Sequence, residues 1–60
     1  MITNRVLKAF ENGNAAHLAY LAETYYWMSR ACESAGNSGD ALAYAALGDL
    51  AATLLDEVQS

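Results

Sequence analysis

Residues 14–35 read NAAHLAYLAETYYWMSRACESA, and apolar side chains recur along them at the spacing of an α-helix. The stretch contains neither Pro nor Gly, so no residue in it interrupts a helix. Its large apolar residues follow one another at intervals of three and four, which places them on one side of the helix. They are Leu18, Leu21, Tyr25, Met28, Cys32 and Ala35. Such a row predicts packing against a second helix along the whole length.

The second helix is predicted at residues 40–58, DALAYAALGDLAATLLDEV. Asp49, Thr53 and Asp56 share its outer side, a pattern typical of a helix with one buried face. The expected buried side consists of Ala43, Leu47, Leu50, Leu54 and Val58, flanked by Tyr44, Ala51 and Leu55.

The two helices are separated by a short turn, GNSGD, at residues 36–40. Gly36 is suited to end the first helix in a left-handed conformation, and Ser38 or Asp40 is suited to cap the second. A connection this short predicts that the helices run antiparallel beside each other.

Residues 3–11 carry Val6, Leu7 and Phe10 on one face of a further short helix. Two interpretations of the following Asn12-Gly13-Asn14 remain open at this point. Gly13 ends the short helix and Asn14 caps the next one, or a single helix continues from residue 3 to residue 35. The second interpretation is allowed because the apolar positions keep their helical phase across Gly13.

We therefore predict an all-α fold in one domain of 60 residues, with helices at 3–11, 14–35 and 40–58. It is an antiparallel helical hairpin with a short N-terminal helix or helical extension. A chain this short is marginally stable alone, and Cys32 is its only cysteine, so we expect a homodimer that forms a four-helix-like bundle. The residues predicted for the core and dimer are Leu18, Leu21, Tyr25, Met28, Cys32, Leu47, Leu50, Leu54 and Leu55.

Small residues also form a line on each long helix. On the first helix they are Ala15, Ala19 and Ala22, and on the second they are Ala41, Ala45, Gly48 and Ala52. Alanine is common in helices for its propensity alone, so the alanines admit two explanations. Gly48 costs ~1 kcal/mol relative to Ala inside a helix, which a close helix contact would explain.

No combination of residues predicts catalysis. His17 and Cys32 are fifteen positions apart on one helix, more than ~20 Å at 1.5 Å per residue, so they cannot act as a pair within one chain. One His and one apolar-face Cys make a metal site improbable, and no glycine-rich phosphate loop is present. We expect no enzyme activity, no cofactor and no small-molecule substrate.

The net charge of −4, with Arg5, Lys8 and Arg30 as the only Lys and Arg residues, argues against binding to nucleic acid. It favours a neutral or basic protein partner. No uncharged apolar run reaches the ~18–20 residues of a membrane span, and the first residues do not resemble a signal peptide. Together with the single thiol, this predicts a cytoplasmic protein without a membrane segment.

Two large aromatic residues, Tyr20 and Trp27, are predicted to point away from the apolar row, with Tyr26 at its margin. Arg30 is nearby and is expected to pair with Glu33 or Glu23. Large aromatic side chains exposed on the outer face of a helix are unfavourable unless another segment or protein packs over them. Three covers are possible: residues 1–12 of the same chain, a second copy, or another protein. The predicted partner-binding residues are Tyr20, Tyr26, Trp27 and Arg30.

These features favour a non-enzymatic regulatory, adaptor or inhibitor protein that binds another protein, by analogy one of bacterial or phage type. In size and layout the chain also resembles the plasmid copy-number RNA-binding bundle Rop, with no shared motif. That resemblance implies, as the alternative, a dimer of helical hairpins that binds nucleic acid. A third possibility is an acidic mimic of nucleic acid, for which a charge of −4 is small.

Overall fold

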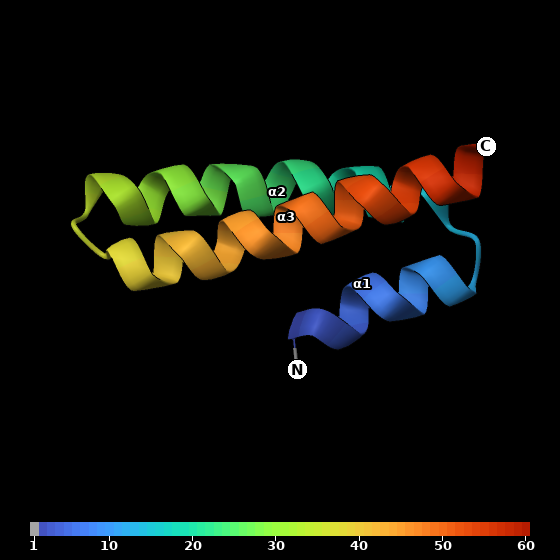
Figure 1. Cartoon of the computed structure of the whole chain (residues 1–60), viewed down its shortest axis with the longest axis horizontal. Coiled ribbons are helices and arrows are strands. Elements are labelled where there is room, and N and C mark those ends of the chain that lie inside the picture. The colour runs from blue at the N-terminus through green and yellow to red at the C-terminus, as the bar shows by residue number, and fades with distance from the viewer. Residues whose placement is uncertain (1) are drawn as a thin grey trace.

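The computed structural model describes the backbone of residues 2–60 and the side chains of residues 5–60. Within this range the chain forms three α-helices, α1 (Ile2–Glu11), α2 (Ala15–Ser34) and α3 (Ser38–Gln59). α2 and α3 form an antiparallel hairpin, and α1 lies along the half of it that holds the C-terminus (Figure 1). The predicted all-α hairpin with a short N-terminal helix is therefore confirmed, and each helix end lies within about two residues of its expected position.

The chain breaks between α1 and α2, as the first interpretation of residues 12–14 expects. Gly13 has a φ of +63°, a backbone conformation that residues other than glycine rarely adopt and that lies outside the right-handed helical region. The helix is interrupted there, so the continuous helix is not formed. The amide of Asn14 donates to the Ala9 carbonyl at 2.9 Å, which closes the end of α1. The Asn14 side chain then accepts a hydrogen bond from the His17 amide at 3.1 Å, which caps the start of α2.

The turn between α2 and α3 also follows the expected chemistry at its first residue. Gly36 has a φ of +82°, and the Asn37 amide donates to the Cys32 carbonyl at 2.8 Å. The expected cap of α3 was wrong, because α3 starts at Ser38 and its N-cap is Asn37, without a side-chain hydrogen bond. Asp40 instead lies in the first turn, where its charge favours the helix dipole.

α2 and α3 approach each other closely through small residues. Gly48 is buried, and a Cβ atom placed on it would lie 3.4 Å from the Ala22 carbonyl oxygen of α2. The Ser29 hydroxyl of α2 donates a hydrogen bond to the Ala41 carbonyl of α3 at 2.9 Å, which joins the two helices. Ala41 is also buried. The close contact that the sequence offered as the reason for Gly48 is therefore present.

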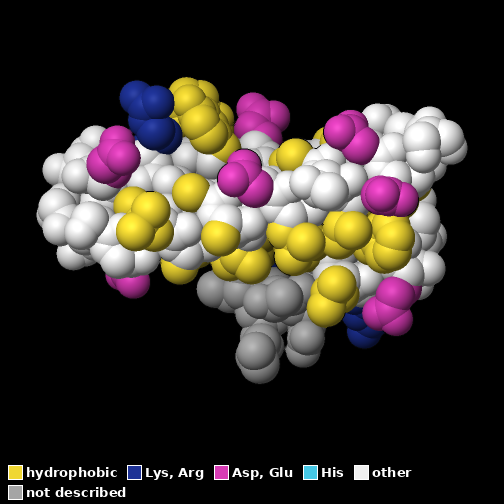
Figure 2. Space-filling model, in the orientation of Figure 1, with side chains coloured by type: hydrophobic (Ala, Val, Ile, Leu, Met, Phe, Trp, Pro, Cys, Tyr) yellow, Lys and Arg dark blue, Asp and Glu magenta, His cyan; other side chains and the backbone are white. Residues whose placement is uncertain are grey.

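The core forms where α1 packs on the hairpin. Its buried residues are Val6, Ala9, Leu18, Leu21, Tyr25 and Ala51. Leu47, Leu50, Leu54, Leu55 and Val58 are partly buried against this cluster. In the view of Figure 2, hydrophobic side chains gather along the junction of α3 with α1. α1 thus covers part of the apolar row whose residues were predicted for the core and the dimer.

The buried side of α3 differs from the expected one. Ala43, predicted on the buried side, is exposed, and the buried positions of α3 are Ala41, Gly48 and Ala51. The face that meets α2 is centred on small residues because they allow the backbones to come close. Four leucines of α3 are consequently only half-buried and pack against the core cluster: Leu47, Leu50, Leu54 and Leu55.

The far end of the predicted row on α2 lies outside the core of the single chain. Met28 is 37% exposed, Cys32 is half-buried and Ala35 is exposed. α1 has 10 residues and α2 has 20, so α1 spans about 15 Å beside a helix of about 30 Å. The half of the hairpin next to the α2–α3 turn therefore has no such cover from the part of α1 whose side chains are described, residues 5–11.

Candidate protein-binding surface

The outer side of α2 carries a row of exposed aromatic residues. Tyr20 is 62% exposed and Trp27 is 61% exposed, and Tyr26 and His17 are also exposed. We call His17, Tyr20, Tyr26, Trp27 and Arg30 the outer aromatic strip. From residue 17 to residue 30 it extends for about 20 Å along the helix. The prediction that Tyr20 and Trp27 point away from the core agrees with these exposures.

The aromatic side chains of the strip contact one another in two groups. The His17 and Tyr20 rings are stacked with centroids 5.9 Å apart. The Tyr26 and Trp27 rings meet edge to face at 5.2 Å. Both are arrangements that aromatic pairs favour, so each large side chain is held by a neighbour while one of its faces stays accessible.

Arg30 belongs to the second group. Its guanidinium donates to the Tyr26 hydroxyl at 3.1 Å and lies 5.9 Å from the centre of the same ring. This contact takes the place of the expected pairing with Glu33 or Glu23. Arg30 therefore adds a positive charge to the aromatic part of the strip, held there by a hydrogen bond and a cation–π contact.

One of the three sequence interpretations proposed that residues 1–12 cover the strip, but residues 5–12, whose side chains the structure describes, do not cover it. Val6 is fully buried in the core on the other side of α2, beside Leu18 and Tyr25. Phe10 is 36% exposed, and Tyr20 and Trp27 keep more than half of their surface. The break at Gly13 turns α1 onto the apolar row rather than onto the outer aromatic residues. The two other covers, a second copy and another protein, remain predictions.

A shallow groove adjoins the strip. It lies between α2 and α3, has a volume of about 400 Å³, and is lined by Ala22, Tyr26, Ser29, Ala45 and Gly48, with Asp49 and Ala52. No described residue of α1 lines it. The groove exists because the lining side chains are small, and Tyr26 belongs both to it and to the strip. Sequence reasoning identified the small residues as a helix contact, but not as the floor of a groove.

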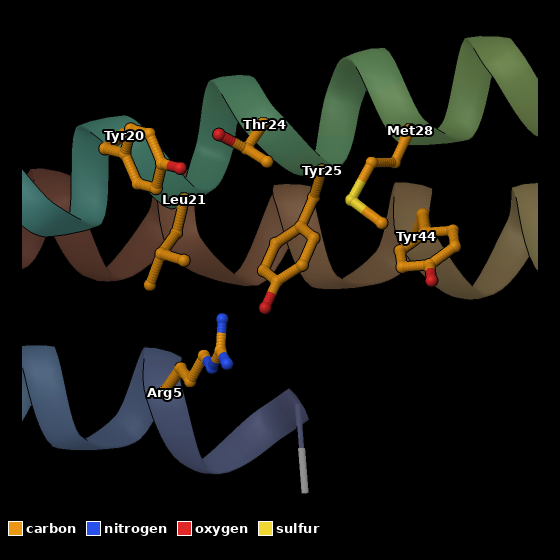
Figure 3. Close-up of a pocket in the computed structure, with 7 residues that line it drawn as sticks. All are labelled: Arg5, Tyr20, Leu21, Thr24, Tyr25, Met28 and Tyr44. Atoms are coloured by element: carbon orange, nitrogen blue, oxygen red, sulfur yellow. The ribbon is translucent and has the colours of Figure 1, made fainter.

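A second hollow of about 400 Å³ lies between Arg5 of α1 and the hairpin formed by α2 and α3. We call it the Arg5 pocket; Arg5 of α1, Tyr20, Tyr25 and Met28 of α2, and Tyr44 of α3 line it (Figure 3). Tyr25 and Tyr44 are stacked with centroids 6.0 Å apart. No pattern in the sequence indicated this pocket, because its residues come together only through the docking of α1.

The chemistry available on the described residues is limited. Among them, no three His, Cys, Asp or Glu side chains come together as a metal site requires. Cys32 is a half-buried free thiol, and His17 is exposed at the start of α2. Over residues 2–60, none of the helices combines the length and the apolar character needed to span a membrane.

Comparison of the chain with protein-family models, with curated proteins and with solved structures gave no match.

Proposed function

We propose that this chain is a non-enzymatic protein-binding module, of the regulatory, adaptor or inhibitor kind, that binds its partner through the outer aromatic strip. The observation that carries the proposal is the exposure of Tyr20 and Trp27, each above 60%, on the outer side of a regular helix. Trp, Tyr and Arg are the residues most enriched among those that dominate binding energy. All three types occur in this strip.

The strip is suited to binding because its side chains are already ordered. Trp27 is in contact with Tyr26, and Tyr26 is in contact with Arg30. A side chain that is held before binding loses less conformational entropy when the partner arrives. The neighbouring groove adds a floor of small residues on which apolar side chains of a partner can lie.

The surrounding charge favours a neutral or basic partner. The chain carries seven acidic and three basic residues, and Asp49 lines the groove beside Tyr26. Acidic side chains are spread along the hairpin in the view of Figure 2. A strongly acidic partner would meet repulsion over most of this surface.

The Rop-like alternative has less support from the arrangement of charges. Such a protein needs cations gathered on one face, whereas Arg5 and Lys8 belong to α1 and Arg30 lies in the second half of α2. In addition, α1 packs on the apolar row that a second hairpin would cover in such a dimer. We therefore retain the protein-binding proposal.

Homodimer formation is part of the proposal but no longer depends on the whole apolar row. α1 covers the part near Leu18, and the part of the row that remains exposed includes Met28. Light scattering coupled to size exclusion at micromolar concentration should return about twice the chain mass of 6.4 kDa. A monomer at all concentrations would remove the dimer from the proposal and leave the binding strip untouched.

The Trp27→Ala variant tests the strip itself. We expect its helicity and melting temperature to stay close to those of the parent, because Trp27 lies outside the core. Affinity for a partner captured from the native host should fall by about 2 kcal/mol or more, roughly 30-fold. Leu42→Ala is the matched control, since Leu42 is 73% exposed but lies outside the strip.

Fluorescence of the single Trp gives a second, partner-independent measurement. In the isolated chain its emission should be that of a solvated indole and should be quenched by acrylamide, then shift to the blue when the partner binds. Equal losses of affinity in Trp27→Ala and Leu42→Ala would contradict the proposal. So would blue, unquenchable emission from the monomer.

A further inference from the structure

The Arg5 pocket has a structural cause that is independent of the outer aromatic strip. α1 is half as long as α2, so the described part of α1 lies beside only one half of the hairpin, and the Arg5 pocket lies at the edge of that half. Tyr25 and Tyr44, one from each long helix, stack on each other and both line the pocket; Tyr25 is buried in the core and Tyr44 is half-buried. The rim on the α2 side is formed by Tyr20, Thr24 and Met28, which follow one another at intervals of four (Figure 3).

The chemistry of the lining is unusual for this chain. None of the described lining residues is acidic, although acidic residues outnumber basic ones by seven to three in the whole sequence. The one charged group is the Arg5 guanidinium, which extends from α1 towards the hydroxyl end of Tyr25 (Figure 3). Tyr20, Tyr25 and Tyr44 add hydroxyl groups that can donate hydrogen bonds to an anion.

We propose that the Arg5 pocket binds a small organic anion with a flat apolar body, whose acidic group pairs with Arg5 and whose body lies against the accessible lining residues Tyr20, Met28 and Tyr44. The volume of about 400 Å³ is within the range of small-molecule sites. A guanidinium binds carboxylate or sulfonate oxygens in pairs, and aromatic faces and Met28 contact a flat apolar group. This inference goes beyond the proposed function and does not depend on it.

The probe for this chemistry is 8-anilinonaphthalene-1-sulfonate, an aromatic anion that fluoresces on transfer from water to an apolar site. The parent chain should bind it with one site per chain and in the micromolar range. N-phenyl-1-naphthylamine, which has nearly the same ring system but no charge, should bind at least about fivefold more weakly, because it lacks the group that pairs with Arg5.

Three variants separate the Arg5 pocket from general attraction of an anion to positive charge. Arg5→Gln should weaken binding of the sulfonate by about fivefold to tenfold, and Arg5→Lys should restore part of the loss. Lys8→Gln is the matched control, because it removes the same charge from the same helix and Lys8 does not line this pocket. Circular dichroism melting of each variant verifies that the fold is kept.

The binding location is measured directly by amide chemical shifts in a nuclear magnetic resonance titration of the parent chain. The largest shifts should occur at Tyr25, Met28 and Tyr44. Absence of sulfonate binding, equal binding of the neutral dye, or equal loss in Arg5→Gln and Lys8→Gln would each overturn the proposal. Shifts confined to Trp27 and Tyr26 would place the ligand on the outer aromatic strip and would overturn it as well.

Discussion

The contact between α2 and α3 at Gly48 decides whether replacing this glycine by alanine stabilises or destabilises the protein. A Cβ atom at this position would lie 3.4 Å from the Ala22 carbonyl oxygen, and 3.6 Å from both the Tyr25 Cβ atom and the Tyr26 amide nitrogen. These are ordinary van der Waals distances, so a methyl group fits without separating the helices. Gly48→Ala should therefore stabilise the protein.

The size of the effect follows from two contributions. Replacing Gly by Ala inside a helix is worth ~1 kcal/mol, and the buried methyl group adds up to ~0.8 kcal/mol. The Ala22 carbonyl oxygen would lie 3.4 Å from the new methyl group, at the short end of van der Waals distances, and this close contact offsets part of the gain. The net gain in stability is then about 1 kcal/mol. For a domain of this size that corresponds to a rise in melting temperature of about 4–8 °C.

Two further substitutions serve as controls in melting experiments followed by far-ultraviolet circular dichroism. Gly39 is also helical, but a Cβ atom there meets nothing within 4 Å, so Gly39→Ala measures the gain in propensity without a contact. It lies in the first turn of α3, where we expect only a few tenths of a kcal/mol. Gly48→Val brings further methyl groups against the α2 backbone and should destabilise by ~1–3 kcal/mol.

The refuting result is a lower melting temperature for Gly48→Ala while Gly39→Ala is unchanged or higher. It would mean that α2 and α3 are too close at Gly48 to admit a methyl group, so that the distance from the added Cβ atom to the Ala22 carbonyl oxygen is shorter than 3.4 Å. An increase in both Gly48→Ala and Gly48→Val would be equally informative, because it would show that the helices are not in close contact at this position.

Two other predictions concern the core and a helix cap. Leu18→Ala should cost about 3–4 kcal/mol, because Leu18 is fully buried, whereas the same change at Leu42, which is 73% exposed, should cost under ~0.5 kcal/mol. Urea unfolding of the two variants measures this difference, and equal midpoints would contradict the assigned core. Asn14→Ala removes the side-chain acceptor for the His17 amide and should cost ~1 kcal/mol, while Asn14→Ser should retain most of the cap. A melting temperature unchanged by Asn14→Ala would show that this cap does not stabilise α2.

Local features of the amino-acid sequence determined the helices and their ends. Helical spacing of apolar residues predicted all three helices, and Gly36 was identified as the residue that ends α2. At Gly13 the sequence was compatible with both a break and a continuous helix. The apolar residues before and after Gly13 keep the same helical phase, and the energy of capping by Asn14 is too small to decide between the two. The outward direction of Tyr20 and Trp27 was also predictable, since position along a helix fixes the direction of a side chain.

Only the tertiary structure decided which faces are covered. The rotation of α3 places Ala41 and Gly48 in contact with α2, because backbones approach most closely where side chains are small. It leaves Leu47, Leu50, Leu54 and Leu55 half-buried against the core cluster. The docking of Val6 and Ala9 then buries Leu18, Leu21 and Tyr25 of the apolar row. Met28, which lines the Arg5 pocket, stays exposed, as does Ala35, and Cys32 is half-buried. Helical periodicity states which residues share a face of one helix. The burial of that face depends on contacts between segments far apart in the chain, which periodicity does not encode.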